Sequence, residues 1–108
     1  MNKKKDFGYK EENTDILVLS TASHTAINRS VYRLLDKNYK VVLVCPKVSY
    51  LNGRFIKSDL RKENDPFIIF DDIDTRNPRL NNFKNLTKIF KFLRPIRVIV
   101  DNDPASFM

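Results

Sequence analysis

The chain has 108 residues, of which 42% are hydrophobic and 31% charged, and its formal net charge is +7. That length suits at most one domain, and no apolar run approaches the roughly 20 residues that a bilayer-spanning helix needs. A single histidine and a single cysteine exclude both an internal disulfide and a zinc finger.

The positive charge is spread along the chain and belongs to no recognisable nucleic-acid motif. We therefore expect no nucleic-acid partner, and an anionic membrane surface or a phosphorylated ligand fits the charge better. The basic start Met1–Lys5 is no secretory signal, because charged residues follow where an apolar stretch is required. The sequence predicts a disordered polar tail over residues 1–13 and a cytoplasmic protein, with peripheral contact at the inner face of the membrane as a further expectation.

The first predicted elements form a strand–helix–strand unit. The apolar segment Asp15–Ser20 predicts a strand buried on both faces, and a polar loop over Ser20–Thr25 follows it. The apolar residues of the next helix are expected to face the core; they are Ile27, Val31, Leu34 and Leu35. Its polar residues are expected on the wet side; they are Asn28, Arg29, Arg33, Asp36 and Lys37. The run Val41–Cys45 then predicts a second strand, parallel to the first and joined by a right-handed crossover.

The structure of residues 47–65 stays open in this interpretation. Asn52-Gly53 is a turn signal that would close a small hairpin. Lys57–Lys62 would fit one helical turn. Because a structureless loop of this length is uncommon in a compact domain, some ordered structure is expected here.

Three further elements complete the predicted order: a strand at Phe67–Phe70, a helix at Asn82–Leu93 and a strand at Ile96–Val100. The helix is amphipathic, with apolar residues on one face and lysines on the other. The apolar residues are Phe83, Leu86, Phe90 and Leu93, and the lysines are Lys84, Lys88 and Lys91. Packing on the sheet accounts for this pattern, and additional membrane contact by the lysine face stays open.

These elements predict an α/β fold, a Rossmann-like open parallel sheet of about four strands in the order 3-2-1-4, flanked by helices. After the fourth strand, Asp103 stands at a helix N-cap position and Pro104 at the first helical position. The given chain stops about one turn later, and a single turn is not a stable helix. We therefore expect residues 14–108 to form a partial Rossmann-like domain, incomplete at the C-terminus.

The candidate site follows from a rule for open parallel sheets, which bind ligands outside the carboxyl ends of their strands where the strand order reverses. His24, in the loop after the first strand, is the candidate catalytic residue. The candidate substrate-binding residues follow the first and fourth strands; they are Ser20, Thr21, Ser23, Asp101, Asn102, Asp103 and Ser106. Two alternatives stay open, in which His24 has no chemical task and Asp103 only caps a helix.

Cofactor and metal sites are not expected. The loop after the first strand has neither Gly-x-Gly-x-x-Gly nor a P-loop sequence, so its backbone cannot wrap a pyrophosphate. Asp71, Asp72 and Asp74 are interpreted as a solvated loop without the spacing of an EF-hand. Cys45 is interpreted as a small core residue.

Three segments resemble the amino-terminal domain of family-four-type glycosyltransferases; they are Asp15–Ser20, Val42–Pro46 and Arg94–Ser106. That resemblance implies the GT-B architecture, in which two Rossmann-like domains face each other across a cleft. The first domain would hold the acceptor, and the second, with its paired-glutamate motif, would hold the nucleotide-sugar. By the resemblance, His24 and Asn102–Ser106 would lie at the rim of the cleft. Thr21-Ala22-Ser23 departs from the family, which often has a glycine pair there, so phosphate contact at this loop is not implied.

Two functional hypotheses follow. In the first, the chain is a fragment of a glycosyltransferase that moves a sugar from a nucleotide-sugar to an acceptor, and this acceptor-side domain is inactive without a C-terminal domain. In the second, the chain is a small non-enzymatic α/β binding or regulatory module. A receiver domain is the less favoured form of this module, because the first strand ends in Ser20 rather than in an acidic pair.

Overall fold

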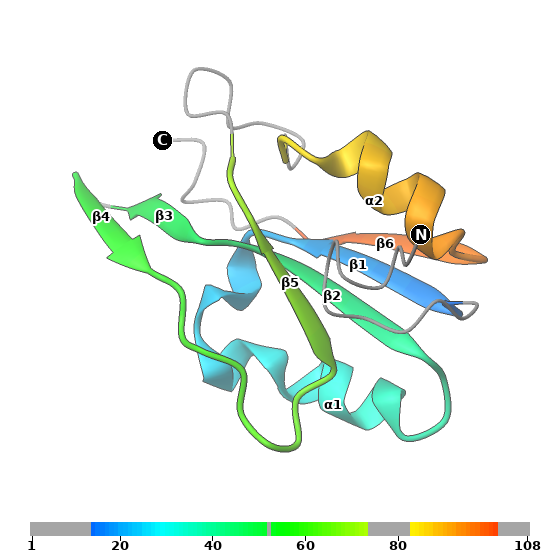
Figure 1. The fold of residues 1–108 in the computed structure, drawn as a ribbon. Helices are drawn as coiled ribbons and strands as arrows, with labels where there is room; N and C mark the ends of the chain where they lie inside the picture. The colour runs from blue at the N-terminus through cyan, green and yellow to red at the C-terminus, as the bar shows by residue number, and fades with distance from the viewer. Residues whose placement is uncertain (1–13, 52, 74–82, 102–108) are drawn as a thin grey trace.

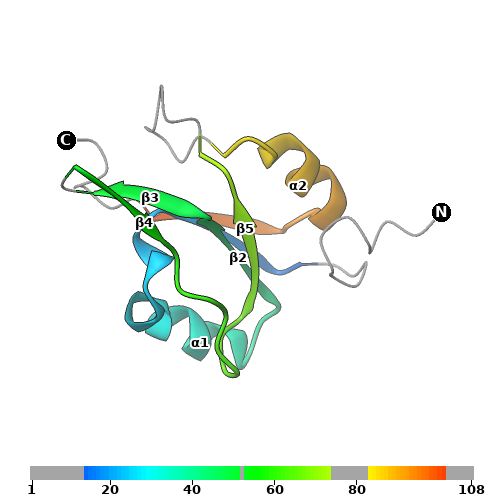
Figure 2. The same cartoon turned by 60° about the vertical axis from the view of Figure 1, so that its left-hand side comes forward.

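A computed structural model describes residues 14–51, 53–73 and 83–101 of the chain. Four of its strands form one parallel sheet; they are β1 (Ile16–Ser20), β2 (Val41–Pro46), β5 (Phe67–Asp71) and β6 (Arg97–Asp101). Two helices, α1 (Ser30–Asp36) and α2 (Leu86–Leu93), lie on opposite faces of that sheet (Figure 1). A two-stranded hairpin, β3 (Val48–Leu51) with β4 (Arg54–Lys57), extends from one end of the sheet (Figure 2).

The sheet has the strand order β5-β2-β1-β6. Because β3 and β4 form a separate sheet, this is the predicted order of the four apolar runs, 3-2-1-4. All three strand pairs are parallel, with Ser20 beside Asp101 and Pro46 beside Asp71 at their carboxyl ends. The predicted α/β, Rossmann-like class is therefore confirmed, and the carboxyl ends of the four strands lie along one edge of the sheet.

Each face of the sheet has its own hydrophobic core, because successive strand residues point to opposite faces. On one face, β1 and β2 pack against α2 through Leu17, Leu19, Val42 and Val44 on the strands and Ile89 and Leu93 on the helix. On the other face, Val18 and Leu43 pack with Tyr32 of α1. The central strands are thus buried on both sides, as their continuous apolar sequences predict.

The predicted orientation of the first helix is wrong for three of its four apolar residues, whereas Leu35 packs against the core as predicted. Ile27, Val31 and Leu34 were expected in the core, yet their exposed fractions are 79%, 53% and 62%. Arg29 and Tyr32, by contrast, are buried. The segment Ala26–Arg29 is a 3-10 turn that precedes α1, so the helical periodicity does not run through it. The hydrogen bonds available to Arg29 and Tyr32, described below, determine which face turns inward.

Residues 47–65 contain the hairpin rather than a helical turn. Gly53 has φ of 76°, a left-handed conformation that glycine adopts without steric cost, so the predicted turn at Asn52-Gly53 is confirmed at its glycine. Lys57 ends β4, and the residues after it are not helical. The second helix also starts later than predicted, at Leu86.

Several predicted features fall outside the described residues. They are the tail over residues 1–13, Asp74, the helix start at Asp103-Pro104, and the candidate site residues Asn102, Asp103 and Ser106. Among the residues that are described, no helix has both the length and the apolar character needed to cross a membrane.

Candidate functional site

The strand order reverses between β1 and β6. From β1 the chain moves outward through β2 to β5 and then returns to the other side of β1 as β6. The carboxyl ends of β1 and β6 therefore meet at the point where the strand order reverses, which is the usual position of ligands in open α/β sheets. The backbone N–H of Thr21 donates to the carbonyl oxygen of Asp101 at 3.0 Å and ties the two strand ends together.

Four polar side chains meet at this point, and we call them the switch-point cluster: Ser20, Ser23, Tyr32 and Asp101. The Ser20 hydroxyl lies 2.8 Å from Ser23 Oγ and 3.4 Å from Asp101 Oδ2. The Tyr32 hydroxyl donates to the same Oδ2 at 2.5 Å. Ser20 and Ser23 are buried, whereas Asp101 is partly exposed. The cluster thus holds one partly exposed aspartate through the hydroxyl groups of Tyr32 and Ser20.

Tyr32 is held in its protonated form. Burial, followed by the hydrogen bond to Asp101, raises the pKa of Tyr32 well above its usual value. Its hydroxyl therefore remains a donor at every physiological pH. Because a donor fixes the orientation of the carboxylate, the partly exposed edge of Asp101 is preorganised to accept hydrogen bonds from a ligand.

His24 lies beside the cluster and is buried. Its Nδ1 is 3.2 Å from the carbonyl oxygen of Thr21, and since a carbonyl only accepts, Nδ1 carries the proton in this contact. In a neutral imidazole with the proton on Nδ1, Nε2 is the nitrogen that can accept a proton. The main chain of His24 is also fixed, because its carbonyl oxygen accepts from the N–H of Asp59 at 2.7 Å.

Cys45 lies on the buried side of the switch-point cluster, next to Ser23. It is fully buried, and its thiol donates to the carbonyl oxygen of Ser23 at 3.4 Å. Burial raises the pKa of Cys45 to about 12, against the smaller opposing effect of Arg29. The thiol is therefore unreactive at neutral pH, and the predicted structural role of Cys45 agrees with this environment.

Arg29 fixes the loop that carries Ser23 and His24. Its guanidinium group is fully buried and donates to the carbonyl oxygens of Ser23 at 2.8 Å and Asp59 at 2.6 Å. It also forms an ion pair with Asp65 at 3.2 Å and lies over the ring of Phe70 at 5.9 Å. The side chain predicted to be solvated therefore joins the loop after β1 to residues 59–65.

Asp65 is the carboxylate partner of both Arg29 and Arg33, and the Arg33 contact is 2.6 Å. Burial acts to raise the pKa of Asp65, but hydrogen bonds from the Lys62 N–H, Arg33 and Arg29 outweigh it and hold that pKa below its usual value. Asp65 is therefore ionised at neutral pH. The charged groups of this network bond to one another and to backbone carbonyl groups next to the loop after β1. We therefore assign the network a structural role.

The carboxyl ends of β2 and β5 contribute a second polar pair. Lys47 Nζ lies 3.9 Å from Asp72 Oδ2, and both side chains are exposed. Asp71, which was interpreted as solvated, is buried instead. Its carboxylate accepts from the Asn85 N–H at 2.8 Å and from Asn85 Nδ2 at 2.6 Å. Asp71 therefore anchors the entry to α2, and of the two described carboxylates Asp72 alone has the predicted solvated character.

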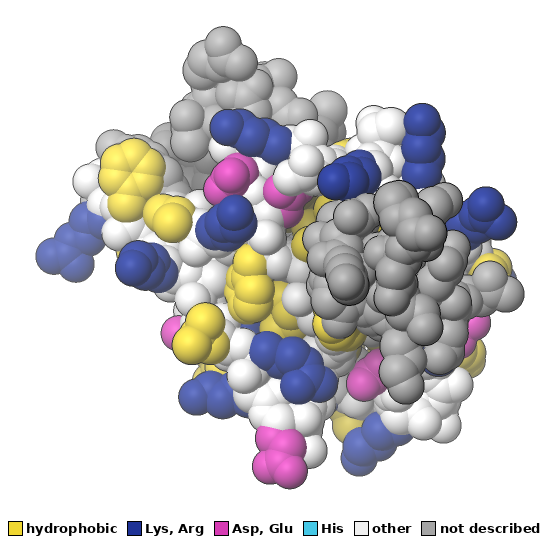
Figure 3. All heavy atoms as spheres, in the orientation of Figure 1, with side chains coloured by type: hydrophobic (Ala, Val, Ile, Leu, Met, Phe, Trp, Pro, Cys, Tyr) yellow, Lys and Arg dark blue, Asp and Glu magenta, His cyan; other side chains and the backbone are white. Residues whose placement is uncertain are grey.

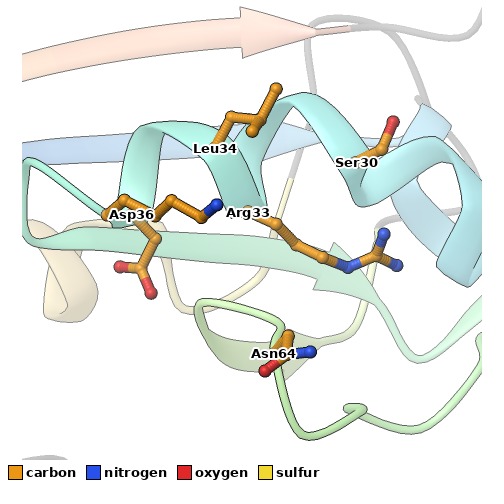
Figure 4. A pocket seen from close by; sticks show the side chains of 6 residues that line it. Ser30, Arg33, Leu34, Asp36 and Asn64 are labelled. Atoms are coloured by element: carbon orange, nitrogen blue, oxygen red, sulfur yellow. The ribbon is translucent and has the colours of Figure 1, made fainter.

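A pocket of about 600 Å³ lies elsewhere, against α1 (Figure 4). It is lined by Ser30, Arg33, Leu34, Asp36, Lys37 and Asn64. Arg33 is engaged by Asp65, and Asp36 accepts a hydrogen bond from the N–H of Val41 at 3.3 Å. Because these charged groups already stabilise the fold, the pocket is a weaker candidate than the switch-point cluster.

The structure brings together the predicted site residues that it describes. Ser20, Ser23 and Asp101 are in direct contact, and Thr21 and His24 adjoin them through backbone groups. Sequence reasoning missed Tyr32 and Arg29. Helical spacing gave no signal for them, because Arg29 ends a 3-10 turn that precedes α1 and the helical periodicity does not run through it.

The cluster suits recognition of hydroxyl groups. A carboxylate and hydroxyls can accept from and donate to a polyol, whereas no three His, Cys, Asp or Glu side chains among the described residues are placed to hold a metal ion. Comparison of the chain with protein-family models, with curated proteins and with solved structures finds no match.

Proposed function

We propose that this chain is the acceptor-side Rossmann-like domain of a glycosyltransferase, which binds the hydroxylated acceptor and depends on a second domain for the nucleotide-sugar. The observation that carries the proposal is the position of the switch-point cluster. Ser20, Ser23 and Asp101 gather where the strand order reverses, the usual ligand position in this class of sheet. The resemblance of the strand segments to GT-B amino-terminal domains supports the same assignment.

The chemistry of the cluster favours a sugar over a phosphate. Its partly exposed charged group is the Asp101 carboxylate, which would repel a pyrophosphate and accept hydrogen bonds from hydroxyls. The loop after β1 has no glycine through which the backbone could approach phosphate oxygens closely. We assign donor binding to another domain for this reason.

His24 is the proposed acid–base residue. Nδ1 lies against the carbonyl oxygen of Thr21, so in the neutral imidazole Nε2 would be the nitrogen that accepts a proton from an acceptor hydroxyl. In this proposal Ser20, Thr21, Ser23 and Asp101 position the acceptor. Asn102, Asp103 and Ser106 would extend the same rim beyond β6.

Peripheral membrane contact is part of the proposal, and the hairpin supports it. Val48, Phe55 and Lys57 share one face of β3–β4, and Phe55 is 71% exposed. Figure 3 shows hydrophobic and basic side chains next to one another over the end of the molecule that carries the hairpin. An exposed aromatic ring beside basic groups suits an anionic lipid surface, where the ring inserts and the cations pair with headgroups.

The experiment is a binding titration by saturation-transfer NMR with a panel of free mono- and oligosaccharides and a panel of nucleotide-sugars. We expect the wild-type chain to bind a saccharide in the millimolar range and to bind no nucleotide-sugar. Asp101→Asn should weaken saccharide binding about tenfold, because a charge-assisted hydrogen bond is lost while Tyr32 keeps an acceptor.

Asp72→Asn is the matched control, since it removes the same charge from the exposed end of β5 and should leave binding unchanged. If no saccharide binds, or if the two variants behave alike, the acceptor-side assignment is wrong. Specific binding of a non-saccharide ligand would instead favour the non-enzymatic binding module. Sugar transfer by the isolated chain would contradict the assignment of the donor to another domain.

A further inference from the structure

Strand β6 is an apolar edge strand with an open side. It stands at the end of the sheet order, so within the described residues it has a hydrogen-bonded neighbour, β1, on one side only. Its three central residues, Val98, Ile99 and Val100, are 42%, 36% and 56% exposed. The strand lacks the proline, central charge or bulge that usually protects an edge from pairing.

The backbone N–H and C=O groups of β6 point alternately toward β1 and toward the open side of the strand. Arg97 donates its N–H to the carbonyl oxygen of Asp15 at 3.0 Å, and the carbonyl oxygen of Asp101 accepts from Thr21. Since alternate strand residues direct their N–H and C=O to the same side, Arg97, Ile99 and Asp101 bond to β1. Val98 and Val100 therefore direct theirs to the open side.

The sequence of β6 is self-complementary in charge. Reading outward from Ile99, the strand has valine on each side, then Arg97 at one end and Asp101 at the other. An antiparallel second copy centred on Ile99 would place Arg97 opposite Asp101 of that copy, twice. The same register would place Val98 opposite Val100 of the second copy, so the outward N–H and C=O groups meet as hydrogen-bonded pairs.

We propose that β6 is a homodimer interface, at which two copies of this chain pair antiparallel about Ile99 and form one continuous eight-stranded sheet. Backbone hydrogen bonds can form only in registers that pair the outward-directed residues, Val98 and Val100, with outward-directed residues of the second copy. Among these, the register centred on Ile99 is the one that sets both described charges against opposite charges.

The exposed stripe of α1 borders this interface. Arg97, Ile99 and Asp101 lie on the same face of the sheet as α1, because Ile99 is in register with Val18, which packs with Tyr32. Figure 4 shows Leu34 directed to the side of α1 on which β6 lies, away from Arg33 and Asp36. A second copy would bring its own α1 to this same face of the sheet. The surface covered by the second copy would then adjoin the exposed apolar residues Ile27, Val31 and Leu34.

Disulfide trapping tests the register. Ile99 would face Ile99 of the second copy in a non-hydrogen-bonded pair, whose Cα atoms lie about 4.5 Å apart, within disulfide range. Ile99→Cys should therefore form a covalent dimer in the full chain under mild oxidation. Val98→Cys is the matched variant and should not, since the two Val98 Cα atoms would be roughly 8 Å apart. Cys45 does not interfere, because it is buried.

Sedimentation velocity on chains without added cysteines tests the charge pairing. We expect a concentration-dependent monomer–dimer equilibrium that Arg97→Glu weakens roughly tenfold, because two attractive pairs become repulsive. Lys91→Glu on the exposed face of α2 makes the same change in net charge and should leave the equilibrium unaltered. Neither variant alters Asp101, so a failure here is distinct from a failure of saccharide binding.

Three results would overturn the proposal. A strictly monomeric chain at all concentrations would show that the edge is covered by another segment of the full protein or by a different partner. Trapping through Val98→Cys instead of Ile99→Cys would show another register. Higher assemblies without a dimer would show unspecific edge aggregation.

Discussion

At the scale of single residues, the site is held by Arg29, which the sequence pattern placed in solvent, and by Tyr32, which the pattern assigned to neither face. Arg29 and Tyr32 stand among alternating apolar and charged residues, and periodicity alone assigned the apolar ones to the core. The structure buries Arg29 instead, because its guanidinium group donates to four backbone carbonyl groups and one carboxylate. Three of these partners, Asp59, Leu60 and Asp65, lie 30 to 36 positions further along the chain, so the local pattern does not reveal them.

The Arg29–Asp65 pair leads to a stability prediction. Asp65→Asn leaves a buried guanidinium group without its counter-charge, and the expected loss is about 3–5 kcal/mol in the free energy of unfolding. For a domain of this size that is a large part of the total stability. Urea denaturation monitored by circular dichroism measures it. Asp72→Asn, in an exposed pair, should cost no more than about 1 kcal/mol; equal losses would contradict the buried network.

The same pair predicts how the free energy of unfolding changes at acidic pH. The pKa of Asp65 in the folded protein lies below its unfolded value of 3.8, so its contribution is fully present above that value. It is lost as pH falls from there through the folded pKa. Urea midpoints measured between neutral and acidic pH should therefore decline more steeply for the wild-type chain than for Asp65→Asn. Parallel declines would show that Asp65 is not preferentially ionised in the fold.

At the scale of elements, strands were more predictable than helices and loops. The four sheet strands begin and end within one residue of the predicted runs, because double-sided burial demands uninterrupted apolar sequence. The second helix starts at Leu86, four residues after the predicted start, since Asp71 holds Asn85 in a non-helical entry. The hairpin was one of two open interpretations, and Gly53 decides it through its positive φ.

The hairpin carries the membrane prediction. Phe55→Ser should reduce binding of the chain to vesicles that contain phosphatidylserine, because the exposed ring no longer inserts between headgroups. Vesicle co-sedimentation measures the bound fraction, and vesicles of phosphatidylcholine alone should bind little. Ile96→Ser removes an equally exposed apolar side chain at the opposite, amino-terminal end of the sheet and is the control. Equal binding by Phe55→Ser and the wild-type chain would assign any membrane contact to another surface.

At the scale of the whole molecule, the sheet order places the candidate site. Strand order 3-2-1-4 follows from two crossovers of the same hand, which put α1 and α2 on opposite faces. That order brings Ser20 beside Asp101, 81 positions apart in the chain. The sequence therefore suffices to predict the meeting of these two strand ends. It does not suffice to predict Tyr32 as their donor, which depends on the rotation of α1.

The most direct test measures the chemical shifts of individual residues while a ligand binds. Amide NMR spectra of the wild-type chain, recorded during titration with the saccharide that binds most tightly, should show shifts concentrated at Thr21, Ser23, His24 and Asp101. Tyr32→Phe, which removes the donor that holds Asp101, should weaken the titration and keep the same pattern. Shifts concentrated instead on α2 or around the α1 pocket, with the switch-point cluster unaffected, would contradict the central claim that the reversal between β1 and β6 is the binding site.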